Sequence, residues 1–175
     1  MSPDFLARLA RRFEGLEADL NALDAATGDG DHGATILKGL RAAAAAPDTP
    51  GLAFRTAAGG ASGTLFSYVI DALAAGATTP LPAALAKAAS RIALIGGAGQ
   101  GDKTMLDALI PAAQAADAAA AARAARAGAD STRSMAARRG RARHVEGAGL
   151  GHLDAGAVSV AEMLELYAAD QGDGG

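Results

Sequence analysis

The chain has 175 residues and a formal net charge of −3 at pH 7, and 50% of its residues are hydrophobic whereas only 3% are aromatic. One domain is expected at this length, with a core built mainly from small aliphatic side chains that let helices approach closely. The net charge gives no general footprint for nucleic-acid binding, and the absence of cysteine excludes disulfides, zinc–thiolate sites and cysteine nucleophiles.

Hydropathy gives a second set of exclusions. Charged residues interrupt the N-terminal segment, so no signal peptide is recognised, and no apolar run is long enough to span a bilayer. We therefore expect a cytoplasmic protein that binds neither nucleic acid nor membrane. A single domain is predicted over residues 1–170, followed by a flexible tail at residues 171–175.

The first predicted helix has a clear beginning and end. Ser2 is a good N-cap and Pro3 suits the first helical position, and hydrophobic residues then recur at helical spacing to about Leu23. This helix ends at Asp24, where the helix macrodipole disfavours a carboxylate.

Residues 24–33, which read DAATGDGDHG, form an acidic loop between two helices. Glycine lets the backbone fold tightly, so that Asp24, Asp29 and Asp31 can converge on one point. Three converging carboxylates repel one another, and an oxygen-seeking cation such as Mg²⁺ would neutralise them and relieve the conflict at Asp24. The alternative is a solvated acidic turn that caps the next helix.

Two further segments predict anion sites at helix N-termini. A helix over residues 34–46 points its N-terminal N–H groups at the acidic loop, with Thr35 nearby and His32 as either a phosphate donor or a plain turn residue. A short helix at residues 52–58 precedes the glycine-rich turn 59–64, where Ser62 faces outward before a helix over residues 65–75. The alternative is that this turn only connects two helices and binds no ligand.

The second half of the chain is also helical. We predict a helix to about Ile95, a glycine turn at residues 96–101, a helix that begins near Asp102, and an alanine-rich helix that continues to about Arg139. A basic loop at residues 140–151 is either solvated or a cationic flap, and the last helix covers residues 158–167. These features predict an all-α fold of seven or eight antiparallel helices, with the glycine and acidic loops at one end.

The motifs, in this order, resemble the nucleotide-binding subunit of dihydroxyacetone kinase, the DhaL family, or the C-terminal nucleotide domain of the single-chain kinases. Each turn alone is a weak signal, but several in order are specific. The matching stretches are residues 20–24 (LNALD), 28–33 (GDGDHG), 59–63 (GGASG), 101–109 (GDKTMLDAL), 140–142 (GRA) and 151–156 (GHLDAG).

This resemblance implies a closed barrel of eight antiparallel helices with the nucleotide, ADP or ATP, at one end. It implies that two Mg²⁺ ions are held by Asp24, Asp29 and Asp31. The residues implied to cradle the phosphates are His32, Gly33, Ala34, Thr35, Ala61 and Ser62. Those implied to line the adenine pocket or to close over the nucleotide are Gly96, Met105, Arg141, Asp154, Ala155 and Gly156.

The resemblance also implies that the chain is half of an enzyme, because a separate subunit or domain of the family holds dihydroxyacetone. In one branch of the family ATP is the donor; in the other, bound ADP is rephosphorylated by a phosphohistidine carrier of the sugar phosphotransferase system. Two alternatives stay open, namely a kinase subunit for another small acceptor and a nucleotide-loaded regulatory module.

The chain departs from the family pattern at three places, the first of which affects the expected flap. Family members usually read GRASYLGERS where residues 140–149 read GRARHVEGAG, so the second family arginine falls on Ala148. Ala155 replaces the usual proline after Asp154, and the segment between Pro111 and Gly128 is shorter than usual. The three aspartates are retained.

Overall fold

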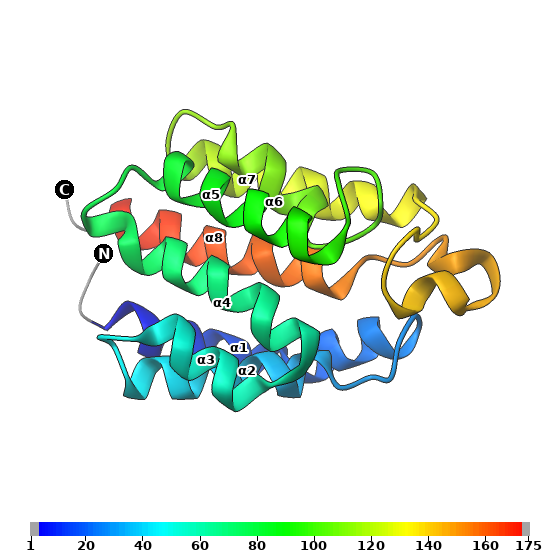
Figure 1. The fold of residues 1–175 in the computed structure, drawn as a ribbon, viewed down its shortest axis with the longest axis horizontal. Coiled ribbons are helices and arrows are strands. Elements are labelled where there is room, and N and C mark those ends of the chain that lie inside the picture. The colour runs from blue at the N-terminus through cyan, green and yellow to red at the C-terminus, as the bar shows by residue number, and fades with distance from the viewer. Residues whose placement is uncertain (1–3, 173–175) are drawn as a thin grey trace.

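The structure, a computed structural model, describes residues 4–172, and the regular elements of that range are all helical (Figure 1). The α-helices of this range are α1 (Phe5–Ala25), α2 (His32–Ala45), α3 (Pro50–Ala58), α4 (Gly60–Ala74), α5 (Leu81–Gly96), α6 (Leu106–Ala113), α7 (Ala118–Ser131) and α8 (Ala155–Gly172). Short 3₁₀ turns cover Ala75–Ala77, Thr132–Ser134, Arg141–His144 and Glu146–Gly149. The predicted all-α class is confirmed.

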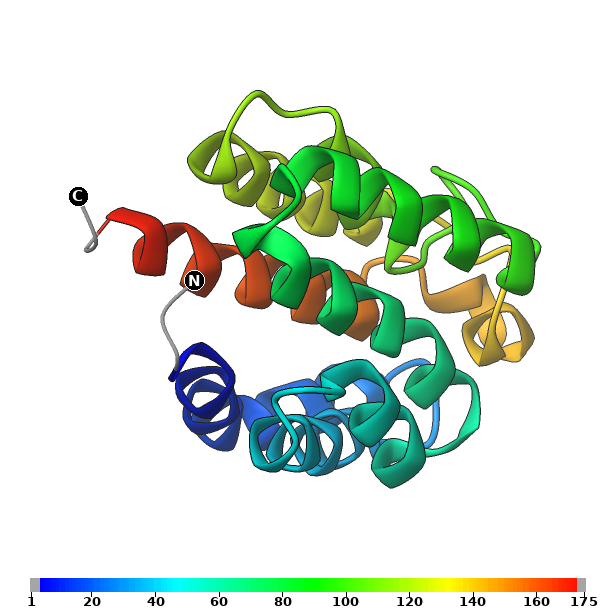
Figure 2. The ribbon, with the colours of Figure 1, turned by 60° about the vertical axis from the view of Figure 1, so that its left-hand side comes forward.

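The helices form a closed, flattened ring. Each α-helix packs against the next along the chain, and α1 packs against α8. Figures 1 and 2 show α4 and α8 in the middle of the molecule, with α1 to α3 on one side and α5 to α7 on the other. None of the helices over residues 4–172 combines the length and apolarity needed to cross a bilayer.

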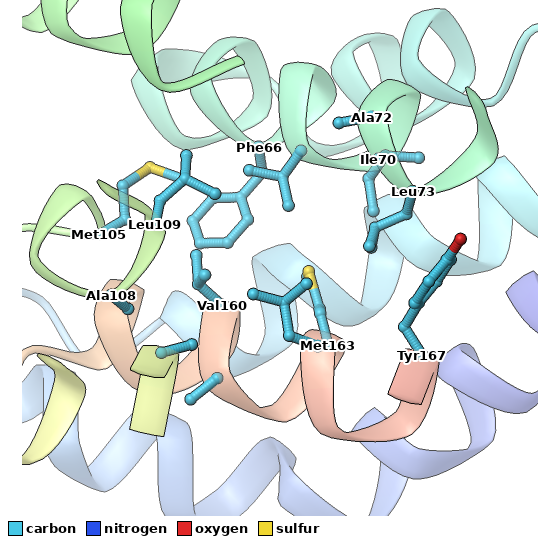
Figure 3. Packing of buried hydrophobic residues seen from close by; sticks show 14 of the residues in the cluster. Phe66, Ile70, Ala72, Leu73, Met105, Ala108, Leu109, Val160, Met163 and Tyr167 are labelled. Atoms are coloured by element: carbon cyan, nitrogen blue, oxygen red, sulfur yellow. The ribbon is translucent and has the colours of Figure 1, made fainter. Parts of the chain in front are cut away.

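The core lies where α4 and α8 face each other. Apolar side chains from both helices meet there, together with the start of α6 (Figure 3). Because α8 is covered on most sides, its buried positions include alanines as well as large residues, and the small side chains allow close helix packing. The labelled core residues of the two facing helices are Phe66, Ile70, Ala72, Leu73, Val160, Met163 and Tyr167.

The prediction of an uninterrupted helix from residue 112 to residue 139 is wrong. Helix α6 ends at Ala113, and α7 begins after Asp117, whose Oδ1 accepts a hydrogen bond from the Ala120 amide at 2.7 Å. Helix α7 then ends at Ser131. The alanine-rich sequence contains too few large residues for periodicity to mark this turn, whereas the packing of α6 against α7 requires one.

Other helix boundaries differ by a few residues. Helix α2 begins at His32 and α4 at Gly60, so most of the expected glycine turn at residues 59–64 is the first turn of α4. Helix α8 extends to Gly172, which places residues 171–172 of the expected tail in a helix. The remainder of that tail, residues 173–175, and the expected cap at Ser2 and Pro3 lie outside the described residues.

A pair of glycines tests this packing. A Cβ at Gly128 of α7 would collide with the backbone carbonyl of Asp107 in α6, whereas a Cβ at Gly15 of α1 would meet nothing within 4 Å. We expect Gly128→Ala to destabilise the domain by about 1–3 kcal/mol through overpacking. Gly15→Ala should stabilise it by up to about 1 kcal/mol through helix propensity. Urea denaturation measures both, and equal effects would contradict the helix packing described.

Candidate functional site

One end of the ring contains a cavity of about 400 Å³. The α1–α2 loop and the segment before α8 lie together at this end (Figure 1). Among the residues expected to form a site, those that line the cavity are Asp24, Asp29, Asp31, His32, Thr35, Ala61, Ser62, Met105, Arg141, Asp154, Ala155 and Gly156.

Four helix N-termini reach this cavity. Its lining includes the first residues of α2, α4 and α8, and Met105 directly before α6. The N–H groups of a first helical turn have no partner within their helix, and the macrodipole adds partial positive charge there. At α4, the backbone turns sharply through positive φ angles at Gly59 and Gly60 before Ala61. The cavity therefore suits an anion with several oxygen atoms.

The three aspartates converge beside these N-termini. Each of Asp24, Asp29 and Asp31 offers one carboxylate oxygen, and these atoms lie within 4.8 Å of one another. Asp24 Oδ2 accepts hydrogen bonds from the amides of Gly30 at 2.8 Å and Asp31 at 3.1 Å. The pKa of Asp31 is raised, first by partial desolvation and then by the charges of its two acidic neighbours. The cluster thus carries the mutual repulsion that a divalent cation would relieve.

Arg141 is the protein's own counter-charge at this cluster. Its guanidinium forms an ion pair with Asp29, and this contact lowers the pKa of Asp29. Arg141 belongs to the loop at residues 140–151, for which the sequence left a solvated loop and a cationic flap as alternatives, and which here forms two short 3₁₀ turns. The side chain of Arg141 is 70% exposed and lines the cavity, so it lies at the cavity mouth.

His32 occupies the first turn of α2 and is buried. Its Nε2 lies 2.8 Å from Ser159 Oγ on α8, and its ring packs edge-on against Phe66 with centroids 5.7 Å apart. Burial lowers the pKa of His32 to about 4, so the imidazole is neutral at pH 7. The ring is held between two helices and lines the cavity.

A buried carboxylate organises the loop before α6. Asp107, which is 1% exposed, accepts hydrogen bonds from the amides of Gly101 at 2.5 Å and Thr104 at 2.8 Å. Between them, Lys103 adopts a positive φ of 60° and donates from Nζ to the carbonyls of Thr132 at 2.7 Å and His152 at 2.5 Å. Sequence reasoning missed both supporting roles, although an acidic residue inside the apolar run 105–110 was an available signal.

Asp154 begins α8 from a largely desolvated position. Its Oδ2 accepts a hydrogen bond from the Ala157 amide at 2.7 Å, and its own amide donates to Thr132 Oγ1 at 2.9 Å. Desolvation raises the pKa of Asp154 to about 6. The positive charge of Lys103 nearby lowers the pKa of Asp154 in part.

Three expected site residues do not line the cavity. The Ala34 amide is already bonded to Asn21 Oδ1 at 3.1 Å, and a Cβ at Gly33 would collide with the Glu17 carbonyl, so Gly33 serves close packing between α1 and α2. Gly96 is the exposed last residue of α5. A role for these residues in nucleotide binding stays a prediction.

A solved structure matches this arrangement along almost the whole chain. The dihydroxyacetone kinase of C. freundii, in complex with AMP-PNP and Mg²⁺, superposes with a TM-score of 0.76 at 28% sequence identity, over 96% of this chain and 33% of that one. Fold and site therefore define the class of the molecule, an all-helical nucleotide-binding domain of the dihydroxyacetone kinase type.

The chain belongs to the DAK2 domain family, whose model matches residues 26–169. Among curated relatives, L-erythrulose 1-kinase of Mycolicibacterium smegmatis is 36% identical over 85% of this chain and 32% of its own length. Dihydroxyacetone kinase of Citrobacter freundii is 35% identical over 89% and 32%, and human triokinase/FMN cyclase is 34% identical over 91% and 33%. The chain thus spans about a third of the length of these relatives.

The two bonds to Asp107 give a stability prediction. Asp107→Asn keeps the shape of the side chain but turns an amide NH₂ group toward one of the two N–H donors, leaving that donor unpaired. We expect a loss of about 1–3 kcal/mol in the free energy of unfolding. The control is Asp117→Asn at the exposed N-cap of α7, where asparagine caps equally well. Equal losses of unfolding free energy for the two variants in urea denaturation would show that Asp107 does not organise this loop.

The raised pKa of Asp154 predicts a pH dependence. Because the folded state holds the proton more tightly than the unfolded state, the stabilisation from Asp154 is present at low pH and is lost as the pH rises through about 6. Without nucleotide and Mg²⁺, the wild type should lose about 2 kcal/mol relative to Asp154→Asn between pH 4 and pH 7. Denaturation curves across this range measure the difference, and parallel profiles would contradict it.

Proposed function

We propose that this domain binds a Mg²⁺–nucleotide complex and forms the nucleotide half of a kinase that phosphorylates dihydroxyacetone or a related short ketose. The observation that carries the proposal is one cavity lined by both an aspartate cluster and four helix N-termini. The cluster suits cations and the N-termini suit phosphate oxygens, so each complements one half of the ligand.

In this proposal Asp24, Asp29 and Asp31 hold two Mg²⁺ ions. Magnesium supplies neutralisation of the charge on the phosphate oxygens, which phosphoryl transfer needs more than it needs a nucleophilic side chain. Asp24 is held in place by two loop amides, and Asp29 is the more exposed partner that a cation would draw from Arg141. The carboxylates then bind Mg²⁺ while the loop backbone keeps its conformation.

The remaining lining residues would bind and orient the nucleotide. The hydroxyl of Thr35 and the first-turn amides near Ser62 donate to phosphate oxygens, and the thioether of Met105 offers an apolar surface for the base. Arg141, once released from Asp29, adds positive charge at the mouth of the cavity. Binding of this kind positions the terminal phosphate for in-line transfer.

The acceptor is proposed to lie on a separate subunit or domain. Relatives named as kinases of dihydroxyacetone and erythrulose are about three times as long as the region matched by this chain. The phosphoryl donor is either ATP, which exchanges, or a phosphohistidine carrier of the sugar phosphotransferase system, which would rephosphorylate bound ADP.

A second candidate function is a nucleotide-loaded regulatory module. The observation that favours it is the loop at residues 140–149, where Ala148 stands in place of the second family arginine and adopts a positive φ of 47°. A flap without an arginine at position 148 provides no positive charge at that point during transfer, while the aspartate cluster is intact.

Removal of Asp29 tests the shared part of both functions. Asp29→Ala should weaken Mg²⁺-dependent ADP binding at least about 10–100-fold. Loss of a residue that only hydrogen-bonds to a metal ligand already lowers metal affinity by that factor. Helix content should be unchanged, since Asp29 lies in the loop between α1 and α2 and its ion-pair partner Arg141 lies outside the α-helices. Titration calorimetry with Mg²⁺ and ADP measures the affinity, with Asp19→Ala on the exposed face of α1 as the charge-matched control. Undiminished affinity in Asp29→Ala would refute the metal assignment.

Reconstitution separates transfer from regulation. The domain is mixed with a dihydroxyacetone-binding kinase subunit and dihydroxyacetone, and then with either ATP or a phosphorylated carrier protein. Formation of the phosphorylated ketose supports the kinase and identifies the donor. Nucleotide binding without any transfer supports the regulatory module.

A further inference from the structure

Ser159 places a hydroxyl group in an otherwise apolar part of α8. It has no exposed surface, and its chain neighbours Val158 and Val160 are buried hydrophobic residues. A hydroxyl at such a position destabilises the fold unless its O–H group donates a hydrogen bond to an acceptor. The partner of Ser159 therefore matters.

The acceptor for this hydroxyl is the ring of His32. The buried hydroxyl of Ser67, by contrast, donates to a carbonyl of its own helix, that of Thr64, at 2.7 Å. For Ser159, the hydrogen bond found within residues 4–172 is the one to His32 Nε2 at 2.8 Å. If Nε2 carried the proton, the Ser159 O–H would be buried without an acceptor, so the favoured arrangement has Ser159 donating to an unprotonated Nε2.

This arrangement decides which atom of His32 carries the ring proton. A neutral imidazole with an unprotonated Nε2 has its N–H at Nδ1, and Nδ1 makes no hydrogen bond within residues 4–172. The edge contact with Phe66 limits rotation of the ring, and His32 lines the cavity. Nδ1 is thus the ring nitrogen left to contact a ligand, and it does so as a donor.

We propose that Ser159 is a positioning residue that fixes His32 as an Nδ1–H donor to a phosphate oxygen of the bound nucleotide. The same proton prevents Nδ1 from ligating a metal ion, so the aspartates alone take the cations and His32 takes the anion. This inference rests on the proposed function, but the position of the ring proton can be measured without any nucleotide.

The first experiment locates the proton. Nitrogen-15 NMR of the nucleotide-free protein distinguishes the two neutral tautomers of each histidine, and the chain has only three histidines to assign. We expect the N–H of His32 at Nδ1 in the wild type, and a shift of the proton toward Nε2 in Ser159→Ala. A wild-type ring protonated at Nε2 would overturn the proposal, even if the Ser159 variant failed to fold.

The second experiment connects the proton to the ligand. Ser159→Ala should weaken Mg²⁺–ADP binding about ten-fold, as expected for one hydrogen bond to a charged group. Ser159→Thr, which retains the hydroxyl, should restore affinity, and Ser67→Ala is the control for loss of a buried hydroxyl away from the cavity. In a His32→Ala background, Ser159→Ala should cause no further loss. An equal loss in that background would show a packing role and contradict the proposal.

The two proposals fail in different ways. A wild-type domain that binds no Mg²⁺–ADP refutes the proposed function while the tautomer of His32 is still observed. A domain that binds the nucleotide with His32 protonated at Nε2 retains the function and refutes the role of Ser159.

Discussion

The mutual repulsion of Asp24, Asp29 and Asp31 is the constraint on which the site depends. Their oxygens lie within 4.8 Å of one another, and Asp24 is in the last turn of α1, where the helix dipole adds further negative potential. Two loop amides and the guanidinium of Arg141 offset part of this repulsion. In the proposed function a divalent cation offsets the rest of the repulsion and couples the acidic loop to a phosphate ligand.

The helical ring creates this meeting of opposite charges. Antiparallel neighbours alternate in direction, so the end of the ring where α1 finishes is also where α2, α4, α6 and α8 begin. Carboxylates at one helix C-terminus therefore face the positive ends of several others. Ordinary packing places them there, with α8 buried through the middle and its N-terminus capped by Asp154 beside the cavity.

The sequence predicted the parts of this site that depend on local chemistry. Glycines and aspartates mark the α1–α2 loop directly, and Gly59 marks the turn before α4, because turn residues act within a few positions. The role of Lys103 and the contact between His32 and Ser159 depend on segments far apart in the chain. No local pattern records such contacts, and uniform alanine in α7 removes even the periodicity that would locate the helix.

The most direct test of the account is a crystal structure of the domain with ADP and Mn²⁺ in place of Mg²⁺. The account predicts two anomalous peaks within about 2.0–2.3 Å of carboxylate oxygens of the three aspartates, with the ADP phosphates on the opposite side of the metal ions at the helix N-termini. Arg141 should have left Asp29. Aspartate side chains pointing into solvent, with no anomalous density between them, would contradict the account.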